Sequence, residues 1–133
     1  MKLLMLDDDC ALLTALKNVL SEHGLDVECC DNAKEAVDRV ANNTYDFVLV
    51  DYKMPENDGL WFMRNVTFPR KTKVLLMTAY LNREVINKMF ALGACGYLIK
   101  PFDDGEILRH IEYHSRPSVP KTGASVGHKH AVA

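Results

Sequence analysis

The chain of 133 residues has the length of one domain, and its composition is 48% hydrophobic and 26% charged, with a formal net charge of −2. No apolar run approaches the ~20 residues that a membrane-spanning helix needs, and the charge balance is not that of a nucleic-acid-binding domain. Because residues 115–133 hold three basic side chains and no acidic one, residues 1–114 carry a net charge of −5. The acidic character of this larger part is the feature to explain.

The N-terminal half alternates apolar runs with helical patterns. The run Leu3–Leu6 predicts a buried strand, and apolar residues at helical spacing over 12–20 predict a helix. The mixed segment Leu25–Cys30 predicts a strand at the edge of a sheet. Asn32 begins an N-x-x-E capping pattern for a short second helix, and Phe47–Val50 predicts another buried strand.

The C-terminal half continues this alternation after a loop with proline and glycine. Its helices and strands are expected, in chain order, at 60–66, Val74–Met77, 82–90, Tyr97–Ile99 and 107–111. Beyond Ser115 the periodicity ends, so residues 1–114 are expected to form the domain and residues 115–133 a flexible tail or a truncated interdomain linker.

Strands that alternate with helices predict an α/β protein, a (βα)₅ doubly wound five-stranded parallel sheet covered by helices on both faces. The four fully apolar runs are expected to be the central strands, with the mixed segment Leu25–Cys30 at an edge.

Each of the four apolar runs ends on a residue with charged or reactive chemistry. The first ends at Asp7 and Asp8, the second at Asp51, the third at Thr78 and the fourth at Lys100. In a parallel sheet the carboxyl ends of all strands lie along one edge, where ligands of open α/β sheets bind. We therefore expect three carboxylates, one hydroxyl and one ammonium to meet there.

These groups together predict chemistry on phosphate. Three adjacent carboxylates repel one another, and a divalent cation such as Mg²⁺, with Mn²⁺ as a substitute, removes that penalty. Lys100 offers a compact positive charge for a phosphate oxygen, and Thr78 offers one hydrogen bond to a transferred group. A free carboxylate among such groups has the surroundings of a phosphoryl acceptor.

Five short motifs carry a resemblance to a known family. They are Leu-Met-Leu-Asp-Asp-Asp at 4–9, Leu-Val-Asp-Tyr-Lys-Met-Pro at 49–55, Asp-Gly at 58–59, Met-Thr-Ala at 77–79 and Gly-Tyr-Leu-Ile-Lys-Pro-Phe at 96–102. With these motifs in this order, the chain resembles the receiver domain of two-component response regulators, which belongs to the CheY-like superfamily. The resemblance implies a flavodoxin-like fold with strand order 2-1-3-4-5.

The resemblance also implies a metal site and an acceptor. Asp51 is expected to be the phosphoacceptor. Asp8 would ligate Mg²⁺ directly, Asp7 largely through water, and Asp51 and the backbone carbonyl of Lys53 would complete the protein ligands.

Further roles follow from the same resemblance. Thr78 would donate a hydrogen bond to the bound phosphoryl group, and Lys100 would pair with Asp51 and then with phosphate. The bond between Lys100 and Pro101 would be cis, as is common only before proline. Tyr97 would be the switch aromatic that turns inward when Thr78 moves toward the phosphate.

As a receiver domain, the chain would take a phosphoryl group from a sensor histidine kinase or a histidine phosphotransfer protein. Phosphorylation would reshape the face of the fourth helix, fifth strand and fifth helix, which would control an output domain or effector protein or form a dimer. The domain would act as a self-phosphorylating and self-dephosphorylating switch, not a metabolic enzyme. We expect it in the cytoplasm, without direct contact to membrane or nucleic acid.

Two other functions are weighed against this one. A Mg²⁺-dependent phosphohydrolase would use Asp51 as nucleophile, but such enzymes often carry a second Asp two residues later, and here that residue is Lys53. A flavodoxin-type cofactor domain would need a Ser-, Thr- or Gly-rich phosphate loop after the first strand. Here that loop is Asp-Asp-Asp-Cys at 7–10, which would repel phosphate unless a metal were bound.

Lys53 and Tyr80 each lie two residues beyond a site residue. In the family these positions flank the approach of hydrolytic water, so a long cation and a bulky ring there predict slow self-dephosphorylation.

The cysteines and histidines receive plainer predictions. The four cysteines, with no metal-like spacing, are expected to be reduced and mostly buried: Cys10, Cys29, Cys30 and Cys95. Two histidine pairs have spacings that permit metal binding but are expected to be solvated: His110 with His114, and His128 with His130.

Overall fold

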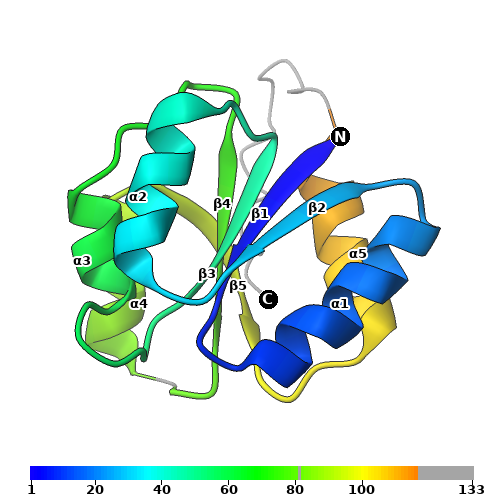
Figure 1. Ribbon diagram of the computed structural model, residues 1–133. Helices are drawn as coiled ribbons and strands as arrows, with labels where there is room; N and C mark the ends of the chain where they lie inside the picture. The colour runs from blue at the N-terminus through cyan, green and yellow to red at the C-terminus, as the bar shows by residue number, and fades with distance from the viewer. Residues whose placement is uncertain (81, 117–133) are drawn as a thin grey trace, which may run out of the picture.

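The computed structural model describes residues 1–80 and 82–116 of the chain. Five strands alternate with five helices (Figure 1). The strands are β1 (Lys2–Leu6), β2 (Asp26–Cys30), β3 (Phe47–Asp51), β4 (Lys73–Thr78) and β5 (Ala94–Ile99). The helices are α1 (Cys10–Glu22), α2 (Ala33–Asn42), α3 (Gly59–Arg64), α4 (Arg83–Ala91) and α5 (Asp104–His114).

The strands form one parallel sheet in the order β2-β1-β3-β4-β5, which confirms the expected (βα)₅ fold and strand order. β2 lies at one edge, as its mixed composition predicted. The expectation that all four apolar runs are central strands is wrong for β5, which lies at the other edge. Ile99 at its end is 43% exposed.

Helices cover both faces of the sheet. Figure 1 shows α1 and α5 on one face and α2, α3 and α4 on the other. Alternate side chains of β1 enter the two cores, because neighbouring residues of a strand point to opposite faces. Leu3 and Met5 pack under α1 and α5, and Leu4 and Leu6 pack under the other three helices.

Every helix begins after an acidic or amide side chain that caps it. The side chain of each N-cap residue accepts a hydrogen bond from a backbone N–H three residues later: Asp9, Asn32, Asp58, Asn82 and Asp103. Such caps each contribute about 1 kcal/mol to helix stability. Five of the chain's many Asp and Asn residues are thereby placed at helix starts.

The prediction of mostly buried cysteines is wrong. Only Cys30 is fully buried, Cys29 and Cys95 are partly exposed, and Cys10 is exposed at the start of α1. Cys29 and Cys30 point to opposite faces of β2, so they contact different cores.

The histidines of α5 also differ from the prediction that they are solvated. His110 and His114 are both partly buried. Burial against β5 lowers the pKa of His114 to about 4. His128 and His130 lie outside the described residues. Among the helices that the structure describes, none has the length and apolar character needed to cross a membrane.

Candidate functional site

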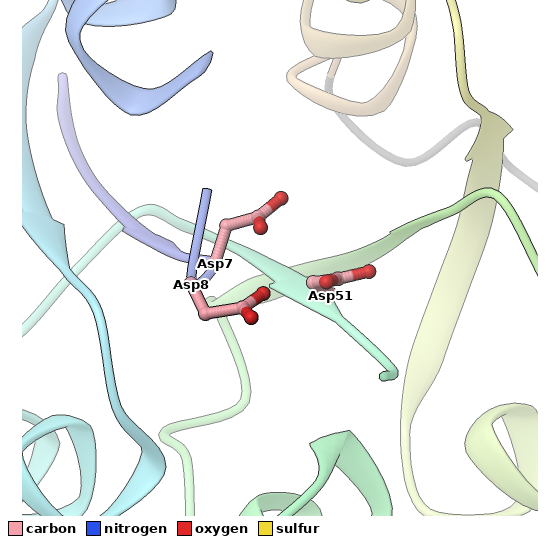
Figure 2. Close-up of side chains that lie close together, drawn as sticks. All are labelled: Asp7, Asp8 and Asp51. Carbon is pink, nitrogen blue, oxygen red and sulfur yellow. The ribbon is translucent and has the colours of Figure 1, made fainter. Parts of the chain in front are cut away.

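The three carboxylates predicted to meet do so at the carboxyl edge of the sheet. Asp7 directly follows β1, and Asp51 is the last residue of β3, which pairs with β1 in the register Leu6 to Val50. One carboxylate oxygen from each of Asp7, Asp8 and Asp51 lies within 4.8 Å of the others. Figure 2 shows the three side chains, hereafter the carboxylate cluster, grouped at these strand ends.

Lys100 is the cation of this site. Its Nζ lies 2.6 Å from Oδ2 of Asp7 and 3.6 Å from Oδ2 of Asp51. The contact of Lys100 with Asp51, which the family resemblance implied, is therefore the longer of its two contacts. The backbone N–H of Lys100 donates to the carbonyl of Thr78, and the Lys100–Pro101 bond is cis.

Asp7 is fully buried and has two donors beside it. Besides the ammonium of Lys100, its carboxylate accepts a hydrogen bond from the backbone N–H of Asp9 at 2.9 Å. Such partners replace the hydration that a carboxylate loses on burial. Asp8, by contrast, is exposed, so its carboxylate faces the solvent side of the cluster.

The surroundings of Asp51 disfavour its ionised form. Burial, and then the charge of Asp7, raise the pKa of Asp51 to about 7, although Lys100 acts in the opposite direction. One ammonium thus does not offset three carboxylates. A hard divalent cation with carboxylate ligands would relieve this repulsion, and Mg²⁺ is the metal that these oxygen ligands fit.

A pocket of about 350 Å³ opens beside Asp51. Its lining combines a carboxylate, a hydroxyl and an ammonium with the residues next to them: Asp51, Lys53, Thr78, Ala79, Tyr80 and Lys100. We call it the strand-end pocket. Thr78 is 1% exposed, and its Oγ1 accepts a hydrogen bond from the backbone N–H of Tyr80 at 2.9 Å. The hydroxyl proton of Thr78 remains available to a group in the pocket.

An aromatic stack borders this pocket. The Nζ of Lys53 lies 4.9 Å from the centre of the Tyr80 ring, and Tyr80 stacks on Tyr52 with ring centres 5.7 Å apart and planes inclined by 14°. The sequence interpretation named Lys53 and Tyr80 but missed Tyr52. Its position next to Asp51, on the loop that carries Lys53, is the signal that was available.

Tyr97 lies apart from the carboxylate cluster. It is partly buried on β5, pairs in register with Leu76 and contacts Phe90 of α4 edge-on, with ring centres 6.3 Å apart. Since Thr78 follows Leu76 by two residues on β4, Tyr97 lies on the strand next to the one that carries Thr78.

Gly59 holds the loop after β3 close to the strand. A Cβ at this position would lie 2.6 Å from the backbone oxygen of Asp51. The N–H of Gly59 donates to the carbonyl of Tyr52 at 2.8 Å, and Asp58 caps α3. Sequence interpretation treated Gly59 only as loop punctuation and part of a motif, and missed this close approach.

Curated relatives with similar sequences are regulatory proteins. The transcriptional regulatory protein CrdR of Helicobacter pylori is 33% identical over 113 residues, which is 84% of this chain and 53% of CrdR. The regulatory protein AtoC of Escherichia coli is 33% identical over 107 residues, 80% of this chain and 23% of AtoC. The chain thus spans about half or less of the length of these relatives.

Solved structures agree with the sequence relatives. The CheY-like receiver domain protein of Methanospirillum hungatei has a TM-score of 0.80 at 26% identity, covering 84% of this chain and 90% of that one. The chemotaxis response regulator CheY4 of Vibrio cholerae has a TM-score of 0.77 at 26% identity, covering 85% and 97%. The family model described as the response regulator receiver domain matches residues 3–112. The chain therefore belongs to the response regulator receiver domain family.

Proposed function

We propose that this domain is a phosphorylation-controlled switch that accepts a phosphoryl group on Asp51. The observation that carries the proposal is the strand-end pocket, in which a buried carboxylate, a hydroxyl and an ammonium face one space beside the carboxylate cluster. The donor would be the phosphohistidine of a sensor histidine kinase or of a histidine phosphotransfer protein.

The transfer uses side chains of the strand-end pocket. A carboxylate oxygen of Asp51 attacks the phosphorus, the P–N bond to the donor imidazole breaks, and the imidazole leaves with the electron pair and takes up a proton. Lys100, 3.6 Å from Asp51, balances negative charge on the phosphoryl oxygens. The hydroxyl of Thr78 donates a hydrogen bond to one of these oxygens.

The carboxylate cluster fits Mg²⁺, or Mn²⁺ in its place. Asp8 and Asp51 would hold the ion directly, Asp7 largely through water, and the backbone carbonyl of Lys53 would be a further ligand. When bound, the ion supplies positive charge that offsets the repulsion among the carboxylates and the phosphoryl oxygens. Because burial, and then the charge of Asp7, raise the pKa of Asp51, positive charge held beside it would favour its ionised, nucleophilic form.

The switch would act through Thr78 and Tyr97. Movement of Thr78 toward the phosphoryl group would free space on the neighbouring strand, and Tyr97 would turn inward from its contact with Phe90. The face of α4, β5 and α5 would change shape as a result. That face would then contact an output domain or an effector protein, or a second copy of the chain.

The output is proposed from the relatives. CrdR and AtoC are regulatory proteins, and each is longer than this chain, which supports a role as the input module of a larger regulatory system. The domain would be cytoplasmic and would convert no metabolite. The phosphohydrolase alternative is not favoured, because Lys53 stands where such an enzyme would carry its acid and contacts an aromatic ring.

Intact-mass measurement after incubation with acetyl phosphate and Mg²⁺ tests this proposal. We expect one phosphoryl adduct, abolished by EDTA and by Asp51→Asn. The matched control is Asp38→Asn, which removes an exposed carboxylate on α2 and should leave the adduct unchanged. An adduct that persists in Asp51→Asn, or no adduct on protein shown to bind Mg²⁺, would contradict the proposal.

A further inference from the structure

The ring of Tyr80 lies at the edge of the strand-end pocket, in a position that only its neighbours can fix. Tyr80 lines this pocket and is 40% exposed. It follows β4 on the loop before α4, where an exposed side chain can change between staggered conformers. The contacts of the Tyr80 ring therefore decide whether it covers the pocket or leaves it open.

Tyr52 gives the Tyr80 ring a flat surface to lie on. The two ring centres are 5.7 Å apart, and the ring planes are inclined by 14°. Offset-stacked aromatic rings favour centre separations of about 4.5–7 Å, so this pair has a favourable geometry. Lys53 contacts the same ring through its ammonium, and the side-chain amide of Asn82 donates to the Tyr80 hydroxyl at 3.5 Å. Tyr52 itself does not line the pocket.

Tyr52 is held more firmly than Tyr80. Its backbone carbonyl accepts a hydrogen bond from the N–H of Gly59 at 2.8 Å, and a Cβ at Gly59 would lie 3.0 Å from the Cα of Tyr52. The side chain of Tyr52 is partly buried and packs against the core under α2, α3 and α4. The stack thus joins a ring packed on the core to a more exposed one, and Tyr80 must break this contact to swing away from the pocket.

We propose that Tyr52 is a positioning residue that slows loss of the phosphoryl group from Asp51, because it holds the ring of Tyr80 over the strand-end pocket. This role rests on the proposed function of Asp51 as the acceptor. In the hydrolysis, a water oxygen attacks phosphorus, and the bond between phosphorus and the Asp51 oxygen breaks. The electron pair stays on the carboxylate, inorganic phosphate leaves, and one proton passes to solvent. The water approaches through the pocket that Tyr80 lines, so a ring held there makes attack less frequent.

Decay of the phosphorylated full chain tests this role. The chain is phosphorylated with acetyl phosphate and Mg²⁺ and freed of the donor by gel filtration, and the adduct is followed by intact mass at constant Mg²⁺. Tyr52→Leu keeps an apolar side chain on the core and removes the flat ring. It should accelerate decay about 2- to 10-fold, the factor that corresponds to one aromatic pair, and by no more than Tyr80→Ala does. Tyr52→Phe keeps the ring and should decay at the parent rate.

A double-mutant cycle separates positioning from a general structural effect. In the Tyr80→Ala background the ring that Tyr52 holds is absent, so Tyr52→Leu should cause no further acceleration. A loosened core would accelerate decay in both backgrounds. The matched control is Phe68→Leu, which removes another partly buried ring of the same core, in contact with Phe62, and should leave the decay rate unchanged.

The possible outcomes distinguish this role from the function of Asp51. Unchanged decay in Tyr52→Leu, or the same acceleration with and without the Tyr80 ring, would overturn the positioning role and leave Asp51 as the acceptor. No adduct on the parent chain would contradict the acceptor function and the positioning role together. Tyr52→Met, which fills the space with a flexible apolar chain, is a second variant should Tyr52→Leu unfold, and the same acceleration is expected from it.

Discussion

Replacing Asp51 by asparagine should stabilise the metal-free domain, and the gain should depend on pH. Burial and Asp7 raise the pKa of Asp51 from 3.8 to about 7. A carboxyl whose pKa is raised by folding favours the folded state while it is protonated. That contribution is complete below the unfolded pKa near 4 and is lost as the pH rises through the folded pKa near 7.

The size of the effect follows from the pKa difference. A shift of about three units at about 1.36 kcal/mol each gives an upper bound of about 4 kcal/mol for the cost of ionised Asp51 in the fold. Asparagine keeps the shape of the side chain, which is only 5% exposed, and removes the charge. It leaves the 2.6 Å contact between Lys100 and Asp7 in place. We expect Asp51→Asn to raise the free energy of unfolding by about 2–4 kcal/mol at pH 8.

Urea unfolding in EDTA at several pH values measures this quantity. The gain of Asp51→Asn over the parent should grow between pH 4 and pH 7 and then remain constant. Asp38→Asn, at an exposed position, should show no such trend. Added Mg²⁺ should narrow the difference at pH 8, because the ion stabilises the parent cluster more than the variant. A gain that is equal at pH 4.5 and pH 8, or a loss of stability at pH 8, would refute the reasoning.

Four other variants test separate contacts. Lys53→Ala should accelerate decay of the acyl phosphate about 2- to 5-fold, which corresponds to the free energy of one exposed cation–π contact. Tyr80→Ala should accelerate it more. Slower decay of radiolabelled protein in either variant would contradict the idea that these side chains shield the acyl phosphate from water. Tyr45→Phe should cost about 1–2 kcal/mol at pH 7, since its hydroxyl lies 2.6 Å from Glu28 and lowers the pKa of that carboxyl. Because this contribution is lost as the pH falls through the lowered pKa of Glu28, urea unfolding should show the stabilities of the two proteins converging in acid. Gly59→Ala should lower the unfolding free energy by about 1–3 kcal/mol in thermal denaturation, since its Cβ would overlap the last carbonyl oxygen of β3.

The sequence predicted the elements of the fold well and their lateral order poorly. Apolar runs identify buried strands, which holds for Phe47–Asp51 in the centre, where every residue is buried. In Ala94–Ile99 at the edge, buried residues alternate with partly or fully exposed ones. The mixed composition of Leu25–Cys30 indicated its edge position, but the run Tyr97–Ile99 is as apolar as the central runs, so hydrophobicity did not reveal the other edge. Strand order therefore came from the family resemblance and not from the pattern.

The residues of the carboxylate cluster were predictable because topology alone places strand ends together. The pairing inside the cluster was not. Lys100 lies nearer to Asp7 than to Asp51, although both carboxylates are buried. The distance between two such side chains depends on how the loops after the strands pack. The spacing of residues along the chain does not indicate that packing.

The cysteine and histidine predictions were wrong for a related reason. Cysteine tends to be buried and histidine tends to be exposed, yet Cys95 and His114 are both partly exposed and contact each other. Nothing in their spacing along the chain indicates contact, since one lies on a strand and the other at the end of the following helix. The residue that permits the contact is Gly96, which leaves room for the imidazole against β5.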